Sequence, residues 1–315
     1  MGVLLALGTA LSYAVMNLSI RKGTQAGGGD NGVLTTLVIN VFAFSVLTVI
    51  AASTGSLQAA HPEAVLWFAM IGLVGAYFGR TFLFAGIHRI GVVRAGAIKN
   101  GAPVITVLLA IAWIGERPSI SDGAGIVLIL VGVFLVVREA LVGARVPAAA
   151  VRAAPGDFFG PADAEAHADR RHATGVALGL LAALSFGAAN AISKVGLNIV
   201  SDVIQAGVIA AWTAMAAYLV TAALRRDLRG AWAAVTARRP WFWLAGLAAT
   251  TGQLTFFAAL QFAPVGPVTV VAASEVVLTT LLGGLLAQRI ELVTRRIAVP
   301  AMLVFAGTVL IALGR

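Results

Sequence analysis

Residues 10–23 read ALSYAVMNLSIRKG and residues 183–196 read ALSFGAANAISKVG, so the opening of the chain recurs in its second half. Each stretch has Leu-Ser and an aromatic residue, then an Asn four positions later and a basic residue after four more. Further along, Glu116 recurs as Glu291 at nearly the same displacement. In a membrane chain, such internal repeats are typical of transporters, whose substrate site lies where the repeats meet.

The composition indicates an integral membrane protein. Hydrophobic residues make up 60% of the chain and charged residues 11%, with a mean hydropathy of +0.96, whereas a soluble domain carries about 25% charged residues. The net charge of +9 lies mostly in loops, which excludes nucleic acid as a partner. The absence of cysteine excludes disulfides and thiolate metal sites. The first apolar run recurs in the second half, so we expect a retained helix and not a signal peptide.

Ten apolar runs are long enough to span the hydrocarbon core of a bilayer, and five fall in each repeat. They cover residues 2–20, 33–52, 65–87, 92–114, 121–137, 174–193, 203–224, 241–262, 266–287 and 296–313. An odd number of spans per repeat predicts two five-helix repeats in opposite orientation. The predicted organisation is a first repeat at 1–137, a flexible Ala-, Pro- and Arg-rich linker at 138–173, and a second repeat at 174–315.

The loop charges predict an orientation. Counted with the adjoining helix ends, the odd-numbered loops carry 17 of the 22 Lys and Arg residues, and the even-numbered loops and the termini carry three. Because positive charge stays on the cytoplasmic side of a membrane, the odd-numbered loops are expected in the cytoplasm and both termini outside.

Two stretches at the junction before the last helix of each repeat carry a family resemblance. Residues 113–117 read WIGER, and residues 287–291 read AQRIE. With the Leu-Ser-aromatic openings, they make the chain similar to the EamA family of the drug/metabolite transporter superfamily. The resemblance implies a ten-helix inverted-repeat bundle with a cavity lined by helices 1, 3, 4, 6, 8 and 9. Family members mostly export amino acids, metabolites or drugs, or carry nucleotide sugars and sugar phosphates. Two departures are Ile290-Glu291 in place of Gly-Glu, and loop charges opposite to the family's usual cytoplasmic termini.

Three charged residues lie well inside predicted spans: Arg80, Lys99 and Glu275. Charges at such depth usually face a cavity or a partner. The repeat overlay matches the pair Lys99-Asn100 with Ser274-Glu275, so we expect the two pairs to face each other near the midplane. Lys99, with Arg80, would receive a carboxylate or phosphate, and Glu275 would receive an ammonium group or carry a coupling proton. The alternative is a Lys99–Glu275 ion pair that only joins two helices.

Further polar residues are candidates for substrate binding. Asn17 and Asn190 are equivalent in the two repeats, and each would bind substrate or bridge to a neighbouring helix. Gln253 and Tyr77 lie on helices that the resemblance assigns to the cavity. Glu116 and its equivalent in the second repeat sit at helix junctions, where structural capping is the favoured interpretation.

Enzyme and cofactor signatures are lacking: no span carries paired acids with metal spacing, and GGGD at 27–30 follows no strand. The sequence therefore predicts a secondary transporter without a cofactor in a bacterial inner membrane. It would export an amino acid or a related zwitterion or anion by alternating access, coupled to an ion gradient such as protons. The alternatives are a multidrug exporter that pairs Glu275 with lipophilic cations, an intramembrane enzyme acting on lipid-linked substrates, and a membrane scaffold.

Overall fold

The computed structural model describes residues 1–25, 32–59, 61–90, 92–143, 161–228, 235, 240–286 and 290–313, and these residues contain helices and no strand. The first half contains α1 (Gly2–Gln25), α2 (Gly32–Ser53), α3 (Pro62–Ile71), the π-helix η1 (Gly72–Gly79), α4 (Arg80–Ile90), α5 (Val92–Lys99), α6 (Ala102–Leu109), the π-helix η2 (Ala110–Ile114) and α7 (Ile120–Gly143). The second half contains α9 (Pro161–Ile199), α10 (Val203–Leu224), α12 (Pro240–Phe262), α13 (Val265–Ala272), α14 (Glu275–Leu286) and α15 (Ile290–Leu313).

Seven helical segments of the described chain are long and apolar enough to cross a membrane. They are Gly2–Gly23, Gly32–Ser53, Pro62–Ile87, His172–Ile199, Val203–Leu224, Pro240–Phe262 and Val265–Gly283. The other three predicted runs overlap three shorter apolar helices, which are Ala102–Ile114, Ile120–Leu135 and Met302–Ile311. The predicted run 92–114 is divided because its helix breaks between Lys99 and Ala102.

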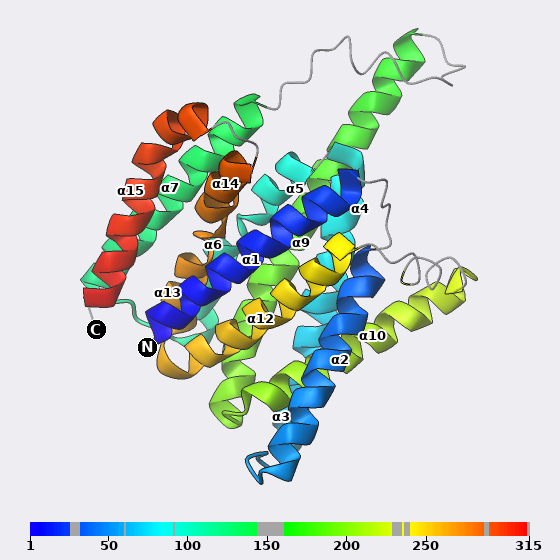
Figure 1. Ribbon diagram of the computed structural model, residues 1–315, viewed down its shortest axis with the longest axis vertical. Helices are drawn as coiled ribbons and strands as arrows, with labels where there is room; N and C mark the ends of the chain where they lie inside the picture. Colours follow the sequence, from blue (N-terminus) through cyan, green and yellow to red (C-terminus); the bar gives the residue numbers. More distant parts are fainter. Residues whose placement is uncertain are drawn as a thin grey trace.

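Long helices from different halves of the chain pack along each other (Figure 1). Helix α1 lies along α12, and α9 lies along the continuous stretch α3–η1–α4. Helix α2 lies against both α10 and α12, and α7 lies against α15. The start of α1 and the end of α15 lie at the same end of the molecule (Figure 1). Small side chains allow such close approach in lipid: Ala6, Ala10 and Ala14 form a fully buried stripe on α1.

Equivalent positions of the two halves make equivalent contacts. Phe68 packs on Gly196, where an added Cβ would lie 2.8 Å from the ring, and Phe242 packs on Gly23 at the same 2.8 Å. The sequence overlay pairs Phe68 with Phe242 and Gly196 with Gly23. The two halves therefore make the same contact between an aromatic ring and a glycine at equivalent positions.

The contact between α7 and α15 is also made by equivalent positions of the two halves. An added Cβ at Gly132 would lie 2.8 Å from the Pro300 carbonyl oxygen, and one at Gly307 would lie 2.6 Å from the Gly125 carbonyl oxygen. Gly132 matches Gly307, and Gly125 matches Pro300, in the sequence overlay. The last helices of the two halves thus pack on each other through equivalent small-residue surfaces.

Both halves have a broken helix at equivalent positions. Helix α5 ends at Lys99 and α6 begins at Ala102, while α13 ends at Ala272 and α14 begins at Glu275. Pro103 lies in the first turn of α6, where it lacks the N–H that a continuous helix would need. The second break contains no proline. Both breaks are tight turns in which backbone N–H groups remain paired: Gly101 N–H donates to the Ile98 carbonyl at 3.0 Å, and Ser274 N–H donates to the Val271 carbonyl at 3.1 Å.

The segment predicted as a linker, residues 138–173, is shorter than expected. Helix α7 continues to Gly143, and α9 begins at Pro161. The Ala-, Glu- and Arg-containing sequence at these ends has a high helix propensity, which a search for apolar runs does not detect. Residues 144–160 lie outside the described residues.

Candidate functional site

The two charged residues that the repeat overlay places opposite each other form an ion pair. Lys99 Nζ lies 2.5 Å from Glu275 Oε1, and the two side chains are 16% and 3% exposed. Lys99 is the last residue of α5 and Glu275 is the first of α14, so each charge occupies the helix end whose dipole favours it. The second carboxylate oxygen, Oε2, is buried and has no hydrogen-bond partner among the described residues.

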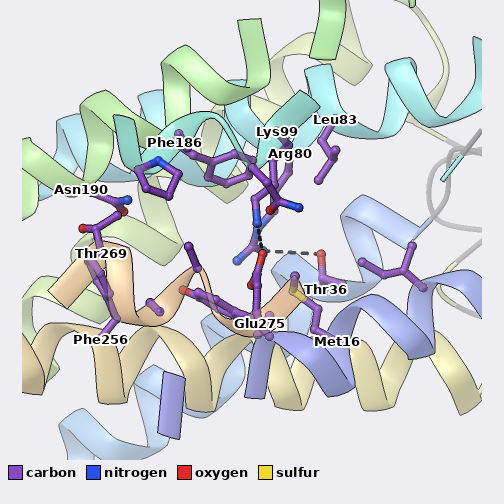
Figure 2. A pocket seen from close by; sticks show the side chains of 18 of the residues that line it. Met16, Thr36, Arg80, Leu83, Lys99, Phe186, Asn190, Phe256, Thr269 and Glu275 are labelled. Atoms are coloured by element: carbon purple, nitrogen blue, oxygen red, sulfur yellow. Dashed lines mark hydrogen bonds and ion pairs between the residues drawn. The ribbon is translucent and has the colours of Figure 1, made fainter. Parts of the chain in front are cut away.

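This ion pair borders a cavity of about 120 Å³ formed by both halves (Figure 2). A single water needs about 10–15 Å³ by this measure, so the cavity has room for several waters or a small solute. The described residues that line it are Tyr13, Met16, Ile20, Thr36, Arg80, Leu83, Phe84, Lys99, Asn100, Ala102, Pro103, Phe186, Asn190, Ala249, Phe256, Thr269, Ala272, Ala273 and Glu275. All six helices that the family resemblance assigns to the cavity contribute lining residues, and Thr36 shows that α2 lines the cavity as well.

Arg80 is held by neutral groups. Its Nη1 donates to Asn40 Oδ1 at 3.0 Å and to Thr36 Oγ1 at 3.5 Å. Asn40 Nδ2 in turn donates to Gln253 Oε1 at 3.2 Å. No carboxylate of the described chain forms an ion pair with Arg80. A hydrogen-bonded chain through α4, α2 and α12 therefore orients the guanidinium without neutralising it.

The structure brings together five of the nine predicted site residues. Arg80, Lys99, Asn100, Asn190 and Glu275 line the cavity. Lys99 Nζ also lies 5.7 Å from the centre of the Phe186 ring, within the range of a cation–π contact. Asn190 Nδ2 donates to Thr106 Oγ1 at 3.4 Å, so this side chain both borders the cavity and bridges α9 to α6.

The other four predicted residues do not line the cavity. Tyr77 Oη shares a hydrogen bond of 2.5 Å with Thr221 Oγ1, and Gln253 holds Asn40. Ser274 is buried with no partner for its hydroxyl among the described residues, and Asn17 is a half-buried residue of α1. Only one face of a helix can border the cavity, and Tyr77 and Gln253 lie on other faces of their helices. Their side chains instead form hydrogen bonds to neighbouring helices.

Several lining residues were not predicted. Tyr13 lies one turn before Asn17 and faces the cavity, whereas Asn17 does not. Thr36 and the buried Asn40 lie on α2, a helix with no expected role. A polar Asn within the strongly apolar run 33–52 was the available signal. The hydrogen bond between Asn40 and Arg80 could not be predicted, because it depends on how α2 and α4 pack against each other.

Glu116 caps a helix of the opposite half. Its carboxylate accepts hydrogen bonds from the backbone N–H of Val265 at 2.7 Å and of Gly266 at 3.2 Å, at the start of α13. The predicted capping role is confirmed, although the capped helix is not the one that follows Glu116 in the chain. The side chain of Glu291 lies outside the described residues.

Comparison with known proteins bears on the fold of the chain. Residues 1–138 match the EamA-like transporter family. A solved crystal structure with 18% sequence identity, covering 99% of this chain and 96% of its own, superposes with a TM-score of 0.64, which shows a shared fold. No curated protein matches the chain. The seven long apolar helices of the described chain and the family match together support a multi-pass membrane protein.

Proposed function

We propose that the protein is a secondary transporter that carries a small charged metabolite through the cavity between its halves. The observation that carries the proposal is the Lys99–Glu275 pair, in which each half supplies one charge from a broken helix beside the cavity. Buried charges at discontinuous helices are how secondary transporters hold substrates and ions near the bilayer midplane.

The proposed architecture is ten membrane helices in two inverted five-helix repeats, residues 1–137 and 174–315, whose last and first helices extend into the connecting segment 138–173. The equivalent contacts of Phe68 and Phe242 support this arrangement, as do the equivalent helix breaks. One repeat would rock against the other around the fixed cavity and expose it to each side of the membrane in turn.

The first choice of substrate is an amino acid or a related zwitterion or anion. Its carboxylate or phosphate would bind Lys99 and Arg80, and an ammonium group would bind Glu275 through the unpartnered Oε2. Asn100 and Asn190 would orient the rest of the molecule from the cavity wall. A bound zwitterion would replace the Lys99–Glu275 contact with one contact to each charge, so neither buried charge would be left unpaired.

The proposed setting is a bacterial inner membrane with both termini outside, as the loop charges predict. Export would be coupled to an ion gradient, with Glu275 as the carrier of a proton. The matched family consists of transporters and not of enzymes, so transport is favoured over chemistry on lipid-linked substrates.

Reconstitution into proteoliposomes tests the proposal. The flux of labelled amino acids, organic acids, sugar phosphates and lipophilic cations is measured with and without an imposed pH gradient. We expect gradient-dependent flux of a charged metabolite that is lost in Lys99→Met and Glu275→Gln, and retained in the matched control Glu63→Gln, an exposed acid at the start of α3. No flux on the whole panel would contradict the proposal. Flux of lipophilic cations alone, lost in Glu275→Gln, would instead indicate a multidrug exporter.

A further inference from the structure

The charges around the cavity do not balance. Among the described lining residues, the charged ones are Arg80, Lys99 and Glu275, which is two cations and one anion. Lys99 and Glu275 neutralise each other through the 2.5 Å contact. The cavity therefore keeps one positive charge, and that charge is on Arg80. An unneutralised charge inside a membrane is costly, so a negative ligand gains the most by entering.

The surroundings of Arg80 orient the guanidinium and leave its charge available. Because Asn40 Nδ2 donates to Gln253, its Oδ1 faces Arg80. Asn40 is 2% exposed, so this amide orientation is set inside the protein and not by solvent. Both hydrogen bonds of Arg80 use Nη1, whereas a guanidinium has five N–H donors. The remaining donors match the two oxygens of a carboxylate.

The rest of the cavity favours an apolar ligand body. Twelve of the nineteen lining residues have aliphatic, aromatic, proline or methionine side chains. Leu83 and Phe84 follow Arg80 on α4 and are 6% and 4% exposed, and Phe256 of α12 is 4% exposed. Figure 2 shows Leu83 and Met16 on one side of the central charges and Phe256 on the other. A ligand that is polar at one end and apolar along its body matches this lining.

We propose that the cavity selects a small monoanion with an apolar body, whose carboxylate binds Arg80 while the Lys99–Glu275 pair remains closed. The inference rests on the proposed transport function and narrows its substrate from zwitterions and anions to monoanions. A zwitterion adds no net charge and leaves Arg80 uncompensated, whereas a monoanion brings the cavity to neutrality. Arg80 is then the principal ligand-binding residue, and Asn40 and Gln253 are positioning residues.

Binding of four probes that share one apolar body tests the inference. The probes are 3-methylbutanoate (anion), leucine (zwitterion), 3-methylbutanamide (neutral) and 3-methylbutylamine (cation), titrated calorimetrically into the full-length protein in detergent. We expect 3-methylbutanoate to bind about tenfold or more tightly than the other three, which is the scale of one charge-assisted hydrogen bond.

The decisive variant is Asn40→Asp, which places a carboxylate next to Arg80 from outside the cavity lining. It should weaken 3-methylbutanoate binding by about tenfold or more. The matched control Asn17→Asp adds the same charge on α1, away from the cavity lining, and should leave binding unchanged. Arg80→Met should abolish binding, and Arg80→Lys should retain part of it. Because both variants lose the guanidinium and only Lys keeps the positive charge, the difference between them reports on the charge and not on the fold.

Other results would overturn the inference. These are tighter binding of leucine that is lost in Lys99→Met, equal affinities in Asn40→Asp and the wild type, or no binding of any probe. The proteoliposome assay separates this failure from failure of the proposed function. Flux of leucine without 3-methylbutanoate binding would remove the inference and keep transport. Binding that Asn40→Asp weakens, without flux of any solute, would keep the anion site and remove transport.

Discussion

The two halves of the molecule agree in how they pack and differ in the charges they present to the cavity. Phe68 on Gly196 and Phe242 on Gly23 are the same contact made twice. By contrast, Arg80 of the first half is matched by Leu254, and Lys99 by Ser274. Two symmetric lysines at the helix breaks would repel each other. The difference in charge between equivalent positions is what allows the Lys99–Glu275 ion pair.

The helix before Arg80 differs in the same way. Residues 72–79 form a π-helix in the first half, whereas the equivalent part of α12 is a regular α-helix. A π-helix turns less per residue than an α-helix and occurs frequently at functional sites. It therefore rotates Arg80 relative to the position that a continuous α-helix would provide. The half that carries both cations is also the half with the irregular helix.

The largest effect is expected where the difference between the halves is largest, at the ion pair. Lys99→Met leaves the carboxylate of Glu275, 3% exposed, without a counter-charge, and Glu275→Met leaves Lys99 unpaired. Each single change should lower the free energy of unfolding by about 3–5 kcal/mol, and the double change should restore most of it. Denaturant unfolding of the detergent-solubilised protein measures this. Additive losses in the double variant would show that the two side chains do not interact.

A smaller effect is expected where the halves are alike, at the contact between α7 and α15. Gly125→Val would bring side-chain atoms against Gly307 and Ile311 and should destabilise the protein by about 1–3 kcal/mol. Gly123→Ala on the same helix meets no atom within 4 Å and should stabilise by about 0.5–1 kcal/mol. Thermal unfolding of the two variants in parallel checks the difference. Equal midpoints would mean that α7 and α15 do not pack as described.

The acidic residues at the helix junctions extend the comparison, because the structure describes the side chain of Glu116 but not that of Glu291. Glu116→Ala removes two hydrogen bonds at the start of α13 and should cost about 0.5–2 kcal/mol. If the symmetry of packing continues to the equivalent Glu291, Glu291→Ala should cost the same. Unfolding midpoints of the two variants provide the measurement. A loss in Glu116→Ala alone would limit the symmetry to the described residues.

The smallest effect on stability is expected at Asn17 and Asn190, which are equivalent in sequence but differently placed. Asn190→Ala removes one interhelical hydrogen bond and should cost about 0.6 kcal/mol. Asn190 lines the cavity and Asn17 does not. We therefore expect Asn190→Ala to weaken binding of the transported solute and Asn17→Ala to leave it unchanged. The same titrations as above compare the two, and equal losses would place Asn17 at the site as well.

Repeats, membrane character and the positions of most spans could be read from the sequence, since apolar runs and recurring motifs are local patterns. The same holds for the site residues that are charged. Arg80, Lys99 and Glu275 stand out because a charge within an apolar run is rare. Polar neutral residues are different, because Asn17 and Asn190 or Gln253 and Asn40 cannot be ranked without knowing which face of a helix meets the cavity.

The amino-acid sequence is enough to predict a membrane chain of two related halves with three charges inside its spans. It also determined that one half carries a carboxylate where the other carries an amide. Three features become visible once the chain is folded: Lys99 pairs with Glu275, Asn40 and Gln253 orient Arg80, and α2 reaches the cavity. The physical reason is that charge and hydropathy belong to single residues. Neutralisation belongs to pairs of residues, and folding alone brings them within hydrogen-bond distance.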